Sequence, residues 1–434
     1  MLERLIWYEV CWLLFVGGFI SLPGKLLPLS LHPYLVIALF LFWPLHSLKQ
    51  RRQQTNGSVA RHCCCSFSTH PIMVPIVLTL LWLPISIWAS TDRSTSWVIA
   101  GYLLWGIALF TALLRWPPMQ QNPPYIAWFL LLSGVGLAII SPPLVAWKPE
   151  FRLFHFPLYD QLMAIPIDLG EMIHANVLAG VLVLILPLLL ALTRQKLCRM
   201  LFILFFLFIA GILVLTQSRG GYLAIAIALP LVLILCWPRL LYGLLPVTLL
   251  VILLLQQSSL RSFLDQLSLD GSLGGWEGRL DIWRNSLLAI SDFTFAGIGI
   301  GTFTVVMPLL YPLQVSIEGY PHAHNLFLQI GLDLGLPGLI AYLAMLIILF
   351  VMLISTLRNP HTLPLHRTLA IGATGSLVGM LVHGLLDAVT WGTKLAFVPW
   401  ILFALITQLF LYTQATQAAY KTSSAIQSNI HLDK

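Results

Sequence analysis

Long apolar runs fill most of this chain, and one polar stretch interrupts them after the middle. A helix that crosses a bilayer needs about 20 mostly apolar residues, so runs of this length predict transmembrane helices. Only 9% of the residues are charged, whereas soluble domains carry about 25%. The runs are continuous and do not alternate with polar residues, which excludes a transmembrane β-barrel. The predicted fold class is therefore an all-α polytopic membrane protein.

The apolar runs predict about 12 transmembrane helices. Their approximate ranges are 5–22, 26–46, 72–90, 97–114, 125–142, 174–192, 200–216, 220–237, 241–256, 328–356, 368–389 and 395–413. The chain then divides into nine helices in residues 1–255, a polar loop at 256–325, three helices in 326–413 and a tail at 414–434 that we expect to be disordered. The Gly335-Leu-Pro-Gly338 motif predicts a break in the tenth helix.

The distribution of positive charge predicts the orientation, because Lys and Arg in short loops favour the cytoplasm. With both termini inside, the inner segments hold fourteen of the 23 Lys and Arg residues, and the outer segments hold nine. The loop at 256–325 then lies on the outer face. The net charge of +7 follows from this topology. Since no basic surface carries interleaved aromatic residues, we expect membrane lipid and no nucleic acid as a partner.

Three arginines near the outer face are candidates for binding an anion. Arg219 lies between two predicted helices in a Ser-Arg-Gly-Gly motif, and Arg279 and Arg284 lie on a helix predicted at 276–290. A guanidinium can hold a diphosphate through two parallel N–H bonds. Residues five apart on a helix diverge by about 140°, so only one of the second pair faces a site, and we favour Arg279. The alternatives are a headgroup contact for Arg219 and a surface salt bridge for Arg279.

Two histidines in the polar loop are candidates for acid–base chemistry. His322 and His324 belong to a Pro-His-Ala-His-Asn motif, and histidine exchanges protons near neutral pH. If Asn325 begins the next helix, His324 lies at a helix N-terminus, where the dipole favours the neutral imidazole that a general base requires. His322 would support it. A solvated structural pair and a metal-binding pair are the alternatives, but the sequence identifies no third metal ligand.

Polar residues inside predicted membrane helices form a third group. His383 and Asp387 are four residues apart in the eleventh helix, and Asn176 lies just inside the sixth. An unpaired charge there costs about 2.5–3.5 kcal/mol, which a hydrogen bond between His383 and Asp387 would relieve. These groups either face a functional site or form structural pairs. The chain has no Asp-x-Asp motif for a catalytic cation, so we expect no metal and no cofactor.

Four motifs, in their order on this topology, resemble the O-antigen ligase and polymerase superfamily of bacterial envelope glycan enzymes. They are Ser218-Arg219-Gly-Gly, Arg279-Leu-Asp-Ile-Trp283, Phe295-Ala-Gly-Ile-Gly-Ile-Gly-Thr-Phe303, and Pro321-His-Ala-His324-Asn-Leu-Phe-Leu followed by Gly335-Leu-Pro-Gly338. The resemblance covers about residues 170–400.

The resemblance implies an inverting, metal-independent glycosyl transfer at the periplasmic face of the bacterial inner membrane. The donor would be a glycan on undecaprenyl diphosphate. The acceptor would be a sugar hydroxyl, on lipid A core for a ligase or on another repeat unit for an O-antigen or exopolysaccharide polymerase. His324 would be the catalytic base, and Arg219 and Arg279 would hold the diphosphate. The remaining predicted substrate-binding residues are Arg284, His322, His383 and Asn176.

Two functions from other classes stay open. A transporter for bicarbonate or a lipid-linked glycan predicts charges near the bilayer midplane and inverted repeats. The candidate charges instead lie toward the outer ends of the predicted helices, and we find no inverted halves. A scaffold subunit without catalysis would tolerate the loss of Arg219 and His324.

Overall fold

The structure is a computed structural model that describes residues 2–22, 26–42, 70–147, 160–162, 172–240, 242–243, 276–312 and 321–432. Within these residues, eight helices are long and apolar enough to cross a membrane. They are α5 (Arg93–Arg115), α7 (Pro124–Leu144), α9 (Ala175–Leu192), α10 (Arg199–Thr216), α11 (Arg219–Cys236), α16 (Leu326–Arg358), α17 (Pro364–Gly384) and α18 (Val398–Leu432). The chain is thus an all-α polytopic membrane protein, as predicted.

The shorter elements complete the described architecture. They are α1 (Leu2–Ile20), η1 (Leu29–Leu31), α2 (His32–Leu39), α4 (Met73–Ala89), α6 (Pro117–Gln121), α14 (Trp276–Asp292), α15 (Phe303–Leu310), and the paired strands β1 (Val145–Ala146) and β2 (Ile173–His174). Helices α1 and α4 nearly match two further predicted ranges, 5–22 and 72–90, whereas α2 occupies only the middle of the range predicted at 26–46. The predicted helix at 241–256 lies almost wholly outside the described residues, so the count of twelve stays a prediction.

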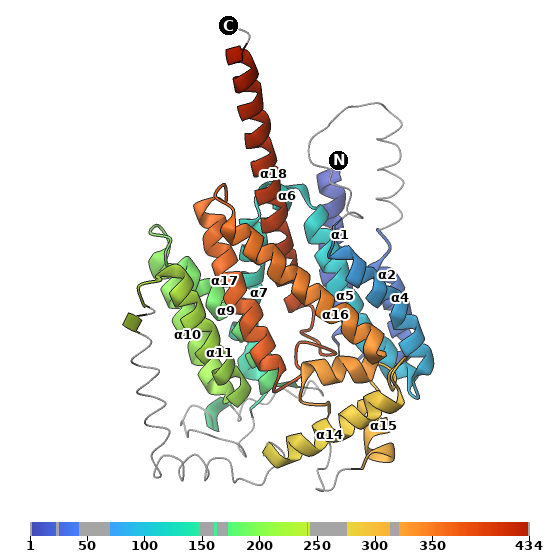
Figure 1. The fold of residues 1–434 in the computed structure, drawn as a ribbon. Coiled ribbons are helices and arrows are strands. Elements are labelled where there is room, and N and C mark those ends of the chain that lie inside the picture. Colours follow the sequence, from blue (N-terminus) through green and yellow to red (C-terminus); the bar gives the residue numbers. More distant parts are fainter. Residues whose placement is uncertain are drawn as a thin grey trace, which may run out of the picture.

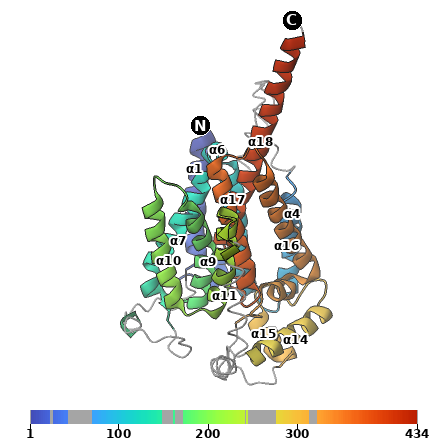
Figure 2. The ribbon, with the colours of Figure 1, turned by 60° about the vertical axis from the view of Figure 1, so that its left-hand side comes forward.

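Burial distinguishes the centre of the bundle from its edge. In α5 and α9, 83% of the residues in an apolar 18-residue stretch of the helix are buried. The corresponding fractions are only 22% in α10 and 28% in α11. Helices α10 and α11 accordingly lie at the side of the bundle (Figures 1 and 2). Since their exposed side chains are mostly apolar, these faces suit contact with lipid chains.

The two ends of the bundle differ. At one end, α14 and α15 lie across the helices, and at the other end α18 extends beyond them (Figure 1). Buried Ile282 and Ala289 of α14 and Met307 of α15 pack with Leu332 of α16, which fixes the crossing helices to the bundle. The expected disorder of residues 414–432 is wrong, because α18 continues to Leu432. That stretch contains no Gly or Pro to end the helix.

The predicted break in α16 occurs at Gly335, whose φ is 66°. There the helix approaches the preceding loop so closely that a Cβ on Gly335 would lie 2.3 Å from the Phe295 carbonyl oxygen. The break also leaves backbone groups available: Leu336 N donates to Thr294 O at 2.8 Å, and Ile298 N donates to Leu332 O at 2.8 Å. The Gly-rich turn after α14 is thereby tied to the kink.

Candidate functional site

A cavity of about 610 Å³ lies at the end of the bundle that α14 and α15 cover. Five of the predicted site residues line it, namely Asn176, Arg219, Arg279, His322 and His324, and Asp387 lines it as well. Arg284 is exposed and does not line the cavity, which agrees with its divergence from Arg279 along α14. Residues far apart in the sequence therefore meet in one chamber.

Arg219 is presented by a tight turn between α10 and α11. Gln217 takes a left-handed φ of 52°, which reverses the chain, and the Ser218 hydroxyl caps α11 by accepting a hydrogen bond from Gly221 N at 3.1 Å. Arg219 is the first residue of α11, at the positive end of the helix dipole. Among the described residues its guanidinium forms no hydrogen bond and no ion pair, and so it is available to a ligand.

Arg279 reaches the same cavity from α14. Its Nε is buried and has no hydrogen-bond partner in the described part of the chain. Burial lowers the pKa of Arg279; Asp387 acts to raise this pKa, and the nearby charge of Arg219 lowers it further. An arginine stays protonated despite such shifts. Two close guanidinium groups repel each other, and an anion between them would relieve this repulsion.

The histidine turn is held by the start of α16. Asn325 caps the helix, since its side-chain oxygen accepts from Phe327 N at 3.0 Å and from Leu328 N at 3.1 Å, and His324 therefore lies at the helix N-terminus. Gln329 Oε1 accepts from Ala323 N at 2.9 Å. Between these anchors, His324 has a left-handed φ of 47°, a conformation that costs a residue with a Cβ about 1–2 kcal/mol. Strain of this kind persists where surrounding contacts impose it.

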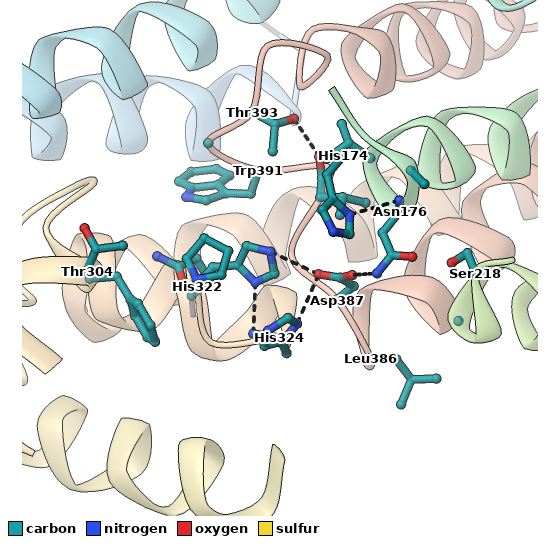
Figure 3. A pocket seen from close by; sticks show the side chains of 18 of the residues that line it. His174, Asn176, Ser218, Thr304, His322, His324, Leu386, Asp387, Trp391 and Thr393 are labelled. Atoms are coloured by element: carbon teal, nitrogen blue, oxygen red, sulfur yellow. Dashed lines mark hydrogen bonds and ion pairs between the residues drawn. The ribbon is translucent and has the colours of Figure 1, made fainter. Parts of the chain in front are cut away.

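The two imidazoles converge on Asp387 (Figure 3). Its Oδ1 lies 3.3 Å from His322 Nε2 and 3.6 Å from His324 Nδ1. Asn176 Nδ2 donates to its Oδ2 at 2.9 Å, and Ala388 N donates to Oδ1 at 2.9 Å. Burial acts to raise the pKa of Asp387, but His322 and His324 outweigh it and hold the pKa below its ordinary value. Asp387 is therefore a carboxylate.

The hydrogen bonds assign the protons of this cluster. His322 Nδ1 accepts from His324 N at 3.2 Å, so a neutral His322 carries its proton on Nε2, which lies 3.3 Å from Asp387 Oδ1. Burial lowers the pKa of His322 to about 4, which keeps it neutral at pH 7. His324 turns Nδ1 toward Asp387, and its Nε2 bonds to no described residue. That nitrogen can accept a proton from a ligand.

The same three side chains bear on the metal alternative. The ligand atoms of His322, His324 and Asp387 lie within 4.8 Å of one another, so the structure supplies the third ligand that the sequence did not identify. A metal on His322 Nε2 would require an imidazolate, however, because Nδ1 already accepts a backbone N–H. A hydrogen-bonded cluster therefore fits the donor set better than a metal centre.

The predicted hydrogen bond between His383 and Asp387 is wrong. Helix α17 ends at Gly384, so Asp387 lies beyond it and its carboxylate turns to the cavity instead. His383 does not line the cavity. It is buried between α9 at Gly180 and α11 at Gly220, and neither ring nitrogen has a hydrogen-bond partner among the described residues.

A second carboxylate organises the far wall of the cavity, and the sequence patterns did not identify it. Asp333 of α16 accepts hydrogen bonds from Trp391 Nε1 at 2.8 Å, Gln329 Nε2 at 3.0 Å and Gly301 N at 3.2 Å. It thereby links the Gly-rich turn to the histidine turn through Gln329. In Figure 3, Trp391 and Thr304 lie on one side of the His–Asp cluster, and Asn176 and Ser218 lie on the other.

Comparison with known proteins agrees with the motifs. Residues 203–343 match the family model described as O-antigen ligase. This match confirms the resemblance to the O-antigen ligase and polymerase superfamily, whose members are enzymes of the glycosyltransferase or ligase type. The matched region includes Arg219, Arg279 and the histidine turn, whereas Asn176 and Asp387 lie outside it. No curated protein matches the chain significantly.

Proposed function

Because its residues 203–343 match the O-antigen ligase family, we propose that this chain is a glycosyltransferase of the bacterial inner membrane. It transfers a glycan from undecaprenyl diphosphate to an acceptor sugar hydroxyl at the periplasmic face. The observation that carries the proposal is the meeting of Arg219, Arg279 and the His324–Asp387 pair in one cavity. These groups match the two charges that develop in such a transfer.

The arginines suit the leaving group. As the bond from the anomeric carbon to the diphosphate oxygen breaks, its electron pair passes to the diphosphate and adds negative charge. Arg219 and Arg279 line the cavity without ion-pair partners among the described residues, and each can donate two parallel N–H bonds to a phosphate. Gly220 lines the same wall and allows close approach to the first turn of α11, where the helix dipole favours an anion.

The His324–Asp387 pair suits the nucleophile. The acceptor hydroxyl oxygen bonds to the anomeric carbon, and its proton passes to His324 Nε2. Asp387, 3.6 Å from Nδ1, stabilises the imidazolium that forms and holds the ring in place. The distance would shorten as the charge develops. The step needs no other reactant, because the diphosphate leaves with the electron pair and the histidine keeps the proton.

In-line attack places the acceptor on the side of the anomeric carbon opposite the diphosphate. Ser218 lies on one side of the His–Asp cluster, whereas Thr304 and Trp391 lie on the other (Figure 3). We place the acceptor sugar at the Thr304–Trp391 wall of the cavity, where an indole ring and the Thr304 hydroxyl suit a sugar ring. The proposal holds for both acceptors, lipid A core in a ligase and a repeat unit in a polymerase.

The position of the charged and polar cavity residues counts against a transporter. Arg219 begins α11, Asn176 is the second residue of α9, and Asp387 follows the end of α17. They gather at one end of the bundle, whereas a transporter keeps its coupling charges near the membrane midplane.

The test is transfer by the purified protein, given an undecaprenyl-diphosphate glycan and a sugar acceptor in the presence of EDTA. We expect transfer by the wild-type protein and none by His324→Ala or Arg279→Ala, while Arg284→Ala, on the same helix outside the cavity, stays active. Transfer that survives both cavity substitutions would remove the mechanism. A strict requirement for a metal ion would favour the metal alternative at His322, His324 and Asp387.

A further inference from the structure

A groove that is separate from the cavity lies at the opposite end of the bundle. It has a volume of about 460 Å³ and is lined by Leu190 and Thr193 at the end of α9, Arg199, Ile203 and Phe206 of α10, and Trp237 after α11. Helix α9 begins beside the cavity and ends at this groove. With 18 residues, it is roughly 27 Å long, close to the thickness of the hydrocarbon core. The groove and the cavity thus belong to opposite membrane surfaces.

Two arginines bring positive charge to the groove: Arg199 lines it, and Arg194 contacts Trp237, which also lines it. Arg199 donates its Nε to Thr193 O at 3.0 Å, while its terminal amines bond to no described residue. Arg194 donates to the Cys236 carbonyl, and its guanidinium carbon lies 5.5 Å from the centre of the Trp237 ring. The first arginine therefore keeps a planar pair of N–H donors for a ligand, and the second is held against Trp237, which lines the groove.

The rest of the groove is apolar, and its surroundings carry positive charge. Leu190, Ile203 and Phe206 form the walls. Leu197, two residues before Arg199 in the sequence, is 97% exposed, which suits an acyl-chain environment better than water. Between Glu171 and Asp265 the sequence holds no acidic residue. The cations Arg194, Lys196, Arg199 and Arg239 in this region thus have no acidic neighbour in sequence. A ligand that complements the groove has an anionic head and a hydrocarbon tail.

We propose that this groove binds an anionic phospholipid of the surrounding bilayer. The phosphodiester accepts the two terminal N–H groups of Arg199 in a bidentate contact, Arg194 adds a second positive charge, and an acyl chain lies along Ile203 and Phe206. The predicted topology assigns this end of α9 to the cytoplasmic leaflet, where anionic headgroups attract basic residues. The site is independent of glycan transfer and shares no residue with the cavity.

The experiment measures which lipid the purified full-length protein retains. The protein is equilibrated in micelles that hold equal amounts of phosphatidylglycerol and phosphatidylcholine, and the bound lipids are counted by native mass spectrometry. We expect the wild-type protein to retain phosphatidylglycerol preferentially. In Arg199→Gln the ratio of bound phosphatidylglycerol to bound phosphatidylcholine should fall about fivefold, because one basic residue near an anionic surface contributes attraction of about that size. Arg358→Gln, which removes an exposed charge from the end of α16, should retain the wild-type ratio.

Two further arms distinguish a lipid site from a site for a free anion. Ile203→Trp fills the apolar wall and keeps both arginines, so we expect it to lower retention of phosphatidylglycerol without a loss of charge. Inorganic phosphate, added in place of lipid, should not raise the melting temperature of the wild-type protein. Equal retention of the two lipids by the wild-type protein would overturn the proposal, as would an Arg199→Gln protein with the wild-type ratio. Stabilisation by phosphate alone would show an ion site without a lipid.

Discussion

Asn176 donates a hydrogen bond of 2.9 Å to Asp387, although 211 residues separate them in the sequence. Asn176 lies in the first turn of α9, and Asp387 follows the end of α17. Because the amide occupies Oδ2, the other carboxylate oxygen is left to face His322 and His324. The contact thus joins two membrane helices and also sets the direction in which the carboxylate acts on the proposed base.

Replacing Asp387 with Asn should impair catalysis far more than donor binding. The substitution keeps the shape of the side chain but removes the charge that stabilises a protonated His324. We expect kcat for glycan transfer to fall on the order of 10²–10⁴-fold, the range of general-base contributions, with a small change in donor KM. Steady-state kinetics provide the measurement. Asp292→Asn, on α14 outside the cavity, is the matched control, and equal kcat values in the two variants would contradict the role given to Asp387.

Replacing Arg219 or Arg279 with Lys separates geometry from charge. Lysine keeps the positive charge but lacks the planar pair of N–H donors. We expect each variant to lose on the order of 100-fold in kcat/KM for the diphosphate donor, comparable with removing one donor that stabilises developing charge. Arg284→Lys on the same helix as Arg279 should match the wild-type protein. Full activity of both cavity variants would mean that charge alone holds the donor.

The sequence predicted the fold class and most helix positions because a membrane imposes a length and a polarity on every helix that crosses it. The Asn325 cap and the divergence of Arg279 from Arg284 were equally predictable, since both depend on spacing within one short segment. The break at Gly335 was predictable for the same reason, because glycine and proline change the conformation of the local backbone.

The partners of Asp387 were not predictable, because they depend on where a helix stops. Four-residue spacing pairs His383 with Asp387 only if α17 continues past Gly384, and it does not. Beyond that end the carboxylate meets residues from the distant histidine turn and from α9. Asp333 and Trp391 were missed for a similar reason, since their contact joins α16 to a loop 58 residues later.

Acid should destabilise the protein partly through His322. Burial lowers its pKa from 6.5 to about 4, so between these values the unfolded chain binds a proton that the folded state does not. Stability therefore falls as the pH drops from about 6.5 to about 4, by up to about 1.4 kcal/mol per pH unit for one proton. Melting temperatures of the wild-type protein and His322→Gln across this range provide the test. The variant should show the shallower decline, and parallel curves would contradict the assignment.

Gly297 should not accept a side chain. Its φ is 70°, and a Cβ would lie 2.2 Å from the Leu332 carbonyl oxygen, in the contact that ties the Gly-rich turn to the kink in α16. We expect Gly297→Ala to lower the free energy of unfolding by about 2–3 kcal/mol. The melting temperature should fall clearly as a result. Gly136→Ala is the control, because nothing lies within 4 Å of its Cβ in α7, and there alanine should raise helix stability by about 0.5–1 kcal/mol.

The left-handed backbone at His324 leads to a prediction that separates folding from chemistry. A residue with a Cβ pays about 1–2 kcal/mol for this conformation, whereas glycine pays little and asparagine adopts it readily. His324→Gly and His324→Asn should therefore melt at or above the temperature of His324→Ala, although all three lack the imidazole and transfer no glycan. If the alanine variant is the most stable of the three, the φ of 47° does not strain the folded protein. If any of them keeps wild-type transfer, His324 is not the base, and His322, which also contacts Asp387, becomes the residue to replace next.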